Sequence, residues 1–256
     1  MTACESDASF PIPAGDGHRQ LANFRDLGGL RLTGGGVTQP GVLYRSDAPY
    51  PGDDVPTGAP QWPPSTVIDL RSAGEGGAGY RWPAGVTVHQ IPLMRRAAVV
   101  TDTVRPARDR PIRLAPLYQA MLQTVASDLA SMVSMAARST GPVLVHCAAG
   151  KDRTGVAVAV LLLTAGAEPE SVVADYAATA SHMSALLGRL RAQGRRLPVD
   201  VDAHSELLGT PVEAIGAVVD RLTGWPGGPA AWVTEHGGSD GDLRRWRDRL
   251  AGGDNS

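Results

Sequence analysis

The stretch at residues 142–165 limits the possible folds of this chain more than any other part of its sequence. It opens with Pro142-Val143-Leu144-Val145, a nearly all-apolar run that is typical of a central strand buried on both faces. The ten residues His146-Cys147-Ala148-Ala149-Gly150-Lys151-Asp152-Arg153-Thr154-Gly155 follow, and a helix is predicted at 155–165. A buried strand, a tight loop and a helix in this order indicate an α/β domain.

Strands and helices are interleaved along the rest of the chain. Strands are predicted at residues 42–44, 66–70 and 86–91. Helices are predicted at 116–138, 169–179, 181–193, 211–222, 230–236 and 240–250. Residues 49–64 and 74–85, rich in proline and glycine, and the arginine-rich residues 94–112 are expected to be loops. We therefore predict an α/β fold with a mostly parallel central sheet, flanking helices and a helical C-terminal third.

The composition is that of an ordinary globular protein. Hydrophobic residues make up 43% of the 256 positions and charged residues 20%, and the formal net charge is −2. Without an excess of positive charge, the chain is not expected to bind nucleic acid. The length suffices for one large domain, which we predict at residues 19–252 after a flexible N-terminal segment at 1–18.

Cysteine usage and the apolar runs bear on the compartment. The two cysteines, Cys4 and Cys147, imply no disulfide framework, which suits a reducing environment. No basic start followed by an apolar run marks a signal peptide, and the longest apolar stretch, at 156–163, is too short to cross a bilayer. We expect a cytoplasmic protein without a transmembrane segment. Export by a route without such a signal stays open, as does the oligomeric state.

The loop between the strand and the helix has the properties of an anion site with its own nucleophile. Amides at a helix N-terminus lack partners within the helix and bind anions without a metal. The same field should stabilise the Cys147 thiolate, the nucleophilic form of cysteine. Five residues separate Cys147 from Arg153, enough for amides to surround a tetrahedral dianion while the guanidinium grips two oxygens. Gly150 and Gly155 permit close backbone approach, and the Thr154 hydroxyl is expected to hydrogen-bond the sulfur.

Lys151 is the only lysine among 24 basic residues, so the preference for arginine seen elsewhere does not hold inside this loop. Taken alone, a cysteine after a buried strand is usually an inert core thiol, and a Gly-Lys pair is usually a turn. The joint pattern at fixed spacing favours chemistry. A Walker-type nucleotide loop is excluded, because Val145 stands at its first glycine and Asp152 follows the lysine in place of serine or threonine.

Residues 146–154 match the signature His-Cys-x5-Arg-Ser/Thr of the cysteine-dependent protein tyrosine phosphatases. Three more segments carry the resemblance: Asn-Phe-Arg-Asp-Leu-Gly-Gly at 23–29, Tyr-Arg-Ser-Asp at 44–47 and Val-Ile-Asp-Leu-Arg at 67–71. With the Gly-Lys-Asp-Arg-Thr-Gly loop, the chain resembles the bacterial atypical tyrosine phosphatases with tyrosine, serine/threonine and phosphoinositide activity. The similarity runs from about residue 20 to the helical C-terminus and implies a tyrosine phosphatase-like domain.

The resemblance implies a two-step reaction that needs no cofactor and no metal. Cys147 attacks phosphorus to form a cysteinyl-phosphate, which water then hydrolyses. Arg153 is implied to bind phosphate and to stabilise the transition state, while the amides of residues 148–153 form the cradle. The predicted substrate-binding residues are Ala148, Ala149, Gly150, Lys151 and Thr154, with His146 and Gly155 supporting the loop.

The general acid is predicted to be Asp152. Most tyrosine phosphatases take this acid from a separate loop, but the segment after the third strand here reads Ile-Pro-Leu-Met-Arg at 91–95. Asp152 stands directly beside Arg153, and a catalytic acid must lie within hydrogen-bond reach of the leaving oxygen. Two alternatives remain. Asp152 could instead bond the loop's own amides or Arg153, and Asp102 in the arginine-rich segment could be the acid.

The substrate class is left open between phosphorylated proteins and phosphoinositides. Lys151 could contact the extra phosphates of an inositol lipid or the substrate's own phosphate. Lipid phosphatases usually carry a further lysine directly after the cysteine, where this chain has Ala148, so we favour phosphotyrosine proteins, with phosphoserine/threonine as further substrates. Residues 95–113, with six arginines and two aspartates, are either a lid for acidic substrates or a solvated loop. A phosphate-binding module with little turnover and a rhodanese-like sulfur transferase are the other interpretations.

The remaining polar groups are interpreted as structural. Residues 23–26 and 45–47 are expected to form a network of ion pairs and hydrogen bonds beside the loop. His89, His182, His204 and His236 lack metal-ligand spacing, so no metal site is predicted.

Overall fold

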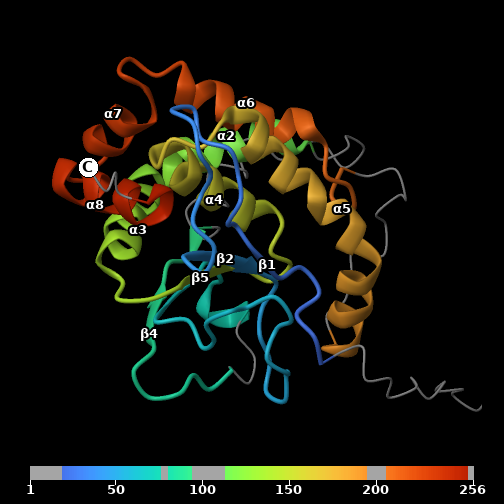
Figure 1. Ribbon diagram of the computed structural model, residues 1–256. Coiled ribbons are helices and arrows are strands. Elements are labelled where there is room, and N and C mark those ends of the chain that lie inside the picture. The colour runs from blue at the N-terminus through green and yellow to red at the C-terminus, as the bar shows by residue number, and fades with distance from the viewer. Residues whose placement is uncertain (1–18, 76–79, 94–112, 195–205, 253–256) are drawn as a thin grey trace, which may run out of the picture.

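The computed structural model describes residues 19–75, 80–93, 113–194 and 206–252, which build a five-stranded sheet with a layer of helices (Figure 1). The strands are β1 (Arg25–Asp26), β2 (Leu43–Ser46), β3 (Thr66–Asp69), β4 (Thr87–Gln90) and β5 (Val143–His146). They are arranged in the order β1-β2-β5-β3-β4. Strand β1 is antiparallel to β2, and all other neighbours are parallel, so the predicted mostly parallel sheet is confirmed.

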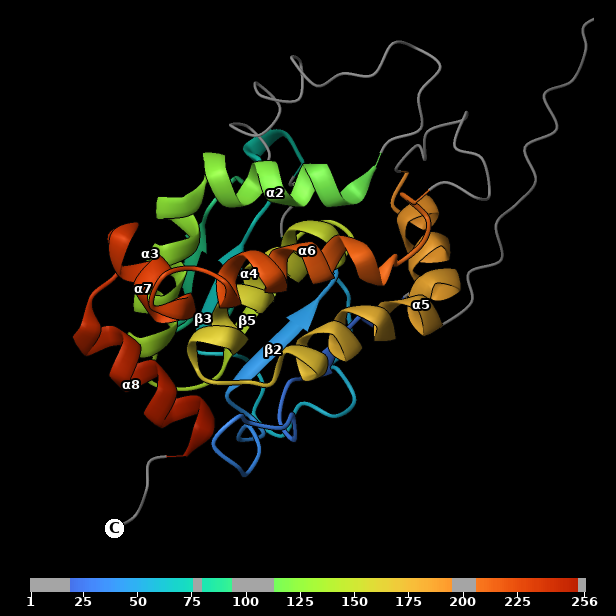
Figure 2. The same ribbon diagram turned by 90° about the horizontal axis from the view of Figure 1, so that it is seen from above.

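The helices form a layer against the sheet, and every element that the structure describes after β5 is a helix. They are α2 (Leu114–Thr124), α3 (Ala126–Arg138), α4 (Asp152–Thr164), α5 (Pro169–Ala192), α6 (Val212–Thr223), α7 (Gly228–Glu235) and α8 (Asp240–Ala251), with a 3₁₀ turn η2 (Ala73–Glu75) after β3. Seen from above, α4 lies over the sheet at the centre of this layer, with α3 and α8 on one side and α5 on the other (Figure 2). The predicted helical C-terminal third is confirmed.

Successive side chains of the central strands enter two separate cores. One cluster lies between the sheet and the helices and includes Leu43, Ile68, Val143 and Val145. The alternate residues point to the other face, where they meet loop residues instead of helices: Tyr44, Val67 and Leu144 pack against Phe24, Trp62, Trp82 and Val86. Both faces of β5 are therefore covered, as the apolar run at 142–145 predicts for a central strand.

Helix α4 is buried along nearly its whole length. All of its residues from Thr154 to Thr164 are buried, and it contacts β2, β5, α3, α5, α6 and α7. A helix that is apolar all round belongs in a core rather than on a surface. This burial holds its N-terminus at the end of β5, immediately after the loop. The helix begins at Asp152, three residues earlier than predicted, so the last residues of the motif form its first turn.

Several predicted boundaries differ from the observed ones. The helix predicted at 116–138 is two helices that meet at Val125, whose φ of −124° and ψ of 29° interrupt the helical backbone. The two helices predicted at 169–179 and 181–193 are one, α5, because the Ser181 hydroxyl bonds to Ala178 O within the helix and does not end it. Strand β1 was not predicted, since two polar residues carry no strand pattern.

The predicted loops are only partly visible. Residues 49–64 contain turns and bends but neither helix nor strand, as predicted. Of the loop predicted at 74–85, the first two residues belong to η2. The N-terminal segment at 1–18 and the arginine-rich segment, apart from Arg113, lie outside the described residues. None of the helices that the structure describes is long and apolar enough to cross a membrane.

Candidate active site

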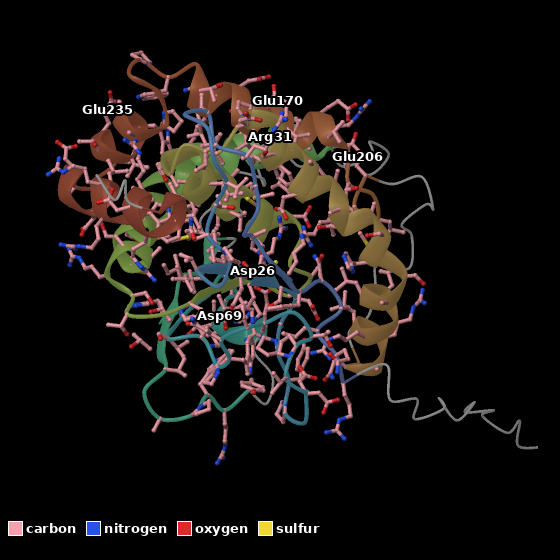
Figure 3. The ribbon with its side chains drawn as sticks, viewed as in Figure 1. Asp26, Arg31, Asp69, Glu170, Glu206 and Glu235 are labelled. Carbon is pink, nitrogen blue, oxygen red and sulfur yellow. The ribbon has the colours of Figure 1, made fainter. Side chains whose placement is uncertain are left out.

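Parallel strands bring three chain segments to one edge of the sheet. Ser46 and Asp69, at the carboxyl ends of β2 and β3, are both register partners of His146 at the end of β5. Figure 3 labels Asp69 in this part of the sheet. The segment that follows β5, residues 147–153, therefore lies between the chains that leave β2 and β3; we call it the Cys147 loop. The carboxyl edge of parallel strands is where α/β proteins bind their ligands.

The backbone of the Cys147 loop is held from outside at three successive carbonyls. The donors are Ala48 N, 3.2 Å from Ala148 O; Asn23 Nδ2, 3.1 Å from both Ala149 O and Gly150 O; and Arg45 Nη2, 2.7 Å from Gly150 O. In a trans peptide, a carbonyl and the N–H that follows it point in opposite directions. The amides after these three carbonyls are thus turned to the inner side of the loop. That is the side of the sulfur, because Gly150 N–H donates to Cys147 Sγ at 3.2 Å.

A buried ion-pair network fixes two of these donors. Asp175 on α5 accepts from Arg25 Nε at 2.7 Å and from Arg45 Nη1. Burial raises the pKa of Asp175, but the charges of Arg45 and Arg25 outweigh this and leave the pKa below its ordinary value. Arg25 Nη1 also donates to Asn23 Oδ1 at 2.6 Å, so the amide nitrogen of Asn23 faces the loop. The interpretation of residues 23–26 and 45–47 as a structural network is confirmed.

The turn of the loop depends on a residue without a side chain. Gly150 has a φ of +66°, which L-residues with side chains rarely adopt. A Cβ at this position would lie 2.3 Å from Ser46 O, a backbone atom of β2. The second predicted glycine acts by packing: a Cβ on Gly155 would lie 2.9 Å from the Tyr176 ring. Both glycines thus allow neighbouring groups to approach closely, and the support that Gly155 gives to the loop stays a prediction.

His146 and Cys147 are both buried where the strand ends. His146 Nδ1 lies 3.3 Å from Cys147 O, and since a carbonyl only accepts, Nδ1 carries the hydrogen in this contact. Burial lowers the pKa of His146 to about 4, against the opposing effect of Asp69. His146 is therefore neutral near pH 7 and supports the backbone beside the thiol without adding charge.

Arg153 extends from the first turn of α4 to the segment after β3. Its Nη1 and Nη2 donate to the two carboxylate oxygens of Glu75, at 2.7 and 2.8 Å, and Nη1 also donates to Leu70 O at 3.3 Å. Burial lowers the pKa of Arg153, but the charge of Cys147 and the contacts with Glu75 raise it above its ordinary value. Because no described residue accepts from Nε, the edge formed by Nε and Nη2 remains for a ligand oxygen.

Asp152 is oriented by hydroxyls in the helical layer. Its Oδ1 accepts from Tyr118 Oη at 2.5 Å, and Tyr118 Oη is 2.8 Å from Tyr176 Oη. Burial and the charge of Asp152 raise the pKa of Tyr118 well above its ordinary value, so this hydroxyl keeps its proton and donates. No described residue donates a hydrogen bond to Oδ2, and the side chain is 29% exposed. One oxygen is therefore anchored while the other stays available.

The sequence analysis expects the Lys151 side chain to contact phosphate, but in the structure this side chain points elsewhere. Its side chain is 3% exposed, and Nζ donates to Leu207 O and Gly209 O, both at 2.8 Å, and to Glu206 O at 3.4 Å. Figure 3 labels Glu206 near α5, at the start of the segment that leads into α6. Nζ also lies 3.3 Å from Asp152 Oδ1. The side chain thus joins the Cys147 loop to residues 206–209. A contact between Lys151 and phosphate stays a prediction for its backbone N–H, but not for its side chain.

Thr154 also differs from expectation. Its Oγ1 is buried and has no hydrogen-bond partner among the described residues, so the predicted bond to the sulfur is wrong for this structure. The role of Thr154 in substrate binding stays a prediction. Within the residues that the structure describes, no group of three or more His, Cys, Asp or Glu side chains could hold a metal ion.

The fold is that of an α/β protein in which the buried Cys147 lies in a tight turn between a parallel strand and a helix. The model of the tyrosine phosphatase family matches residues 18–252. The chain belongs to this family, and the resemblance inferred from its motifs is confirmed.

Individual relatives match shorter stretches. A protein of Cupriavidus necator, provisionally named a tyrosine-protein phosphatase, is 29% identical over 174 residues, which are 61% of this chain and 59% of that protein. A tyrosine-protein phosphatase of Nostoc commune is 45% identical over 49 residues, 19% of this chain and 17% of the relative. The triple specificity protein phosphatase PtpB of Mycobacterium tuberculosis is 57% identical over 35 residues, 14% of this chain and 13% of the relative. The chain thus spans less than two thirds of each relative's length.

The roles of two residues at the site, Glu75 and Tyr118, could not be predicted from the sequence. Glu75 lies in a glycine-rich stretch interpreted as a loop, 78 residues from its partner Arg153. Tyr118 is a buried aromatic residue on α2, 34 residues before Asp152, and no sequence pattern indicates its hydrogen bond to that residue. Only the tertiary fold brings these pairs together.

Proposed function

We propose that this chain hydrolyses phosphate monoesters through a cysteinyl-phosphate, with phosphotyrosine proteins as its main substrates and phosphoserine or phosphothreonine as further ones. One observation carries this proposal: three carbonyls of the Cys147 loop accept hydrogen bonds from outside, and the Gly150 N–H donates to the sulfur, so we expect the amides that follow these carbonyls on the side of the sulfur. Such a ring of N–H groups fits the equatorial oxygens of a phosphoryl group. Membership of the tyrosine phosphatase family supports the same reaction class.

In the first step, the Cys147 thiolate attacks phosphorus. The S–P bond forms as the P–O bond to the leaving group breaks, and Asp152 gives its proton to the departing oxygen. Arg153, with its Nε edge free, binds two non-bridging oxygens and stabilises the charge of the transition state. Glu75 holds the guanidinium in place through Nη1 and Nη2, and the second hydrogen of Nη2 remains for the ligand together with Nε. The phosphorylated cysteine and the free alcohol or phenol are the products of this step.

In the second step, water attacks the cysteinyl-phosphate. Asp152, now a carboxylate, accepts a proton from this water, the S–P bond breaks and Cys147 leaves as a thiolate. Phosphate is released and the starting state is restored once Asp152 is protonated again. The Tyr118 bond to Oδ1 leaves Oδ2 for both proton transfers, so one carboxyl group serves as acid and then as base.

The experiment that tests this function is a phosphate-release assay on three substrate classes: phosphotyrosine peptides, phosphoserine/threonine peptides and phosphoinositide vesicles. Asp152→Asn is expected to lower kcat/KM on phosphoserine peptides by about 100-fold. On p-nitrophenyl phosphate, whose leaving group needs little protonation, the loss should be much smaller. Asp220→Asn, an exposed change on α6, is the matched control.

Each alternative gives its own result in this assay. Full activity of Asp152→Asn on phosphoserine peptides would show that Asp152 is not the acid. Wild-type protein that binds phosphate but releases none from any substrate would support a binding module instead. Consumption of thiosulfate without phosphate release would identify a sulfur transferase.

Lys151→Met separates the structural role of this lysine from a role in binding inositol phosphates. The variant removes the hydrogen bonds that Nζ donates to the carbonyls of residues 206, 207 and 209, so we expect the free energy of unfolding to fall by about 1–3 kcal/mol. Hydrolysis of phosphopeptides and phosphoinositides should fall by the same factor. Urea denaturation and the ratio of the two rates are the measurements. A loss confined to phosphoinositides, with unchanged stability, would show that Lys151 reads a lipid headgroup.

A further inference from the structure

Arg71 lies beside the Cys147 loop because of the register between β3 and β5. Asp69 and His146, the last residues of these strands, are partners, and Leu70 N still donates to His146 O at 2.9 Å. The segments that continue from β3 and β5 are therefore still paired one residue beyond the strands. Arg71 comes after β3 and Cys147 after β5, so the two residues lie at the same edge of the sheet, at the ends of neighbouring strands.

The guanidinium of Arg71 is used on one edge only. Asp69 accepts from its Nε at 2.9 Å and from its Nη2 at 2.7 Å, and the arginine side chain is 6% exposed. The third nitrogen, Nη1, is buried and has no hydrogen-bond partner among the described residues. Burying a charged donor without an acceptor is unfavourable, so a position like this is expected where a ligand supplies the acceptor.

The surroundings of Nη1 indicate what that ligand is. Burial lowers the pKa of Arg71, but Asp69 outweighs this effect, and Tyr50 and Cys147 add to a net increase above the ordinary value. The charge of Cys147 thus contributes to the surroundings of this guanidinium, which agrees with the position of both residues at the same edge of the sheet. Tyr50 Oη is also buried without a partner in the described part of the chain. A second donor group therefore accompanies Nη1 in this region.

We propose that Arg71 is a second phosphate-binding residue, whose Nη1 donates to a non-bridging oxygen of the phosphoryl group at Cys147. The proposal deepens the proposed function and rests on it for the identity of the anion. It assigns parallel roles to two arginines. Each guanidinium is anchored by one carboxylate, Arg153 by Glu75 and Arg71 by Asp69, and each keeps N–H donors for the ligand. Two guanidiniums suit a phosphate dianion better than a singly charged anion.

The direct test is the binding of inorganic phosphate, measured by calorimetry. Arg71→Met is expected to lower the affinity for phosphate by about 10- to 100-fold, the effect of one or two charge-assisted hydrogen bonds. Arg138→Met is the matched control. It removes an arginine that forms the same kind of ion pair with an aspartate, Asp242, but lies on α3 away from the Cys147 loop. The control should bind phosphate as the wild type does.

A second readout separates contact with the anion from a general loosening of the site. The rates at which iodoacetate and iodoacetamide alkylate Cys147 are compared by mass spectrometry of the Cys147 peptide. Iodoacetate is an anion and iodoacetamide is neutral, so Arg71→Met should lower the iodoacetate rate relative to the iodoacetamide rate by about tenfold. A merely structural role would change both rates by the same factor.

Arg71→Lys keeps the experiment decisive if the methionine variant does not fold. A lysine can pair with Asp69 but cannot also direct a second nitrogen at the ligand, so its phosphate affinity should fall as well. Wild-type affinity in either folded variant, with an unchanged alkylation ratio, would overturn the proposal. Failure of the proposed function is seen separately, as wild-type protein that releases no phosphate. The Arg71 measurements need binding and alkylation only, so the two outcomes are distinguishable.

Discussion

Replacement of Cys147 by serine is expected to abolish the hydrolysis of p-nitrophenyl phosphate, with a loss of at least about 10⁴-fold in kcat. A serine hydroxyl is not ionised near pH 7, and the Nδ1 atom of the neighbouring His146 cannot act as a base for it, since this atom donates its hydrogen to Cys147 O. The cradle itself should remain. The carbonyls of the loop are held by Asn23 and Arg45, neither of which contacts the sulfur. Affinity for inorganic phosphate should therefore change by less than about tenfold.

The matched control for this prediction is Cys4→Ser, which removes the other thiol of the chain. Its activity should equal that of the wild type. If Cys147→Ser still turned over substrate at the wild-type rate, the nucleophile would be another group. Loss of phosphate binding together with activity would instead show that the sulfur is needed for the shape of the loop.

Gly150→Ala is expected to damage both the loop and the stability of the protein. Its Cβ would lie 2.3 Å from Ser46 O, and this oxygen belongs to a strand that cannot move independently of the sheet. The φ of +66° adds strain for any L-residue with a side chain. We expect the free energy of unfolding to fall by about 3–5 kcal/mol and phosphate binding to be lost.

Gly166→Ala measures the backbone strain alone. Gly166 follows α4 with a φ of +94°, and a Cβ there would meet no atom within 4 Å. We expect this variant to lose about 1 kcal/mol and to keep full activity. Urea denaturation of both variants gives the difference that is due to the clash. Equal losses in the two variants would mean that the loop adapts to the added methyl group.

The local elements near the loop could be predicted because their signals are local. The apolar run at 142–145, directly before His146-Cys147, predicts a buried strand, and the apolar run after Gly155 predicts a buried helix. Both elements are present in the structure. Breaks within helices were predicted less well. Val125 interrupts a continuous amphipathic pattern without a glycine or proline to signal it, whereas Ser181, which resembles a helix start, lies inside α5.

The directions of the polar side chains could not be predicted in the same way. Lys151 is the only lysine of the chain, but the rarity of a residue does not indicate where its side chain points. Its acceptors are backbone carbonyls 55 to 58 residues further along the chain. Glu75 and Arg71 are fixed by partners that only the sheet register brings near. Pair interactions of this kind need the tertiary fold before they can be recognised.

The donors that hold the Cys147 loop come from distant parts of the chain. Asn23 is 126 residues from Ala149, and Arg45 is 105 residues from Gly150. Contacts across such separations form late in folding, because closing long loops costs chain entropy before any contact repays it. The loop therefore reaches its final shape only when the first strands and α5 are already in place. A fragment that begins after β2 would keep Cys147, Arg71 and Arg153 but would lack Asn23 and Arg45, which hold the carbonyls of Ala149 and Gly150. We therefore expect phosphate binding to return only when the whole fold is complete.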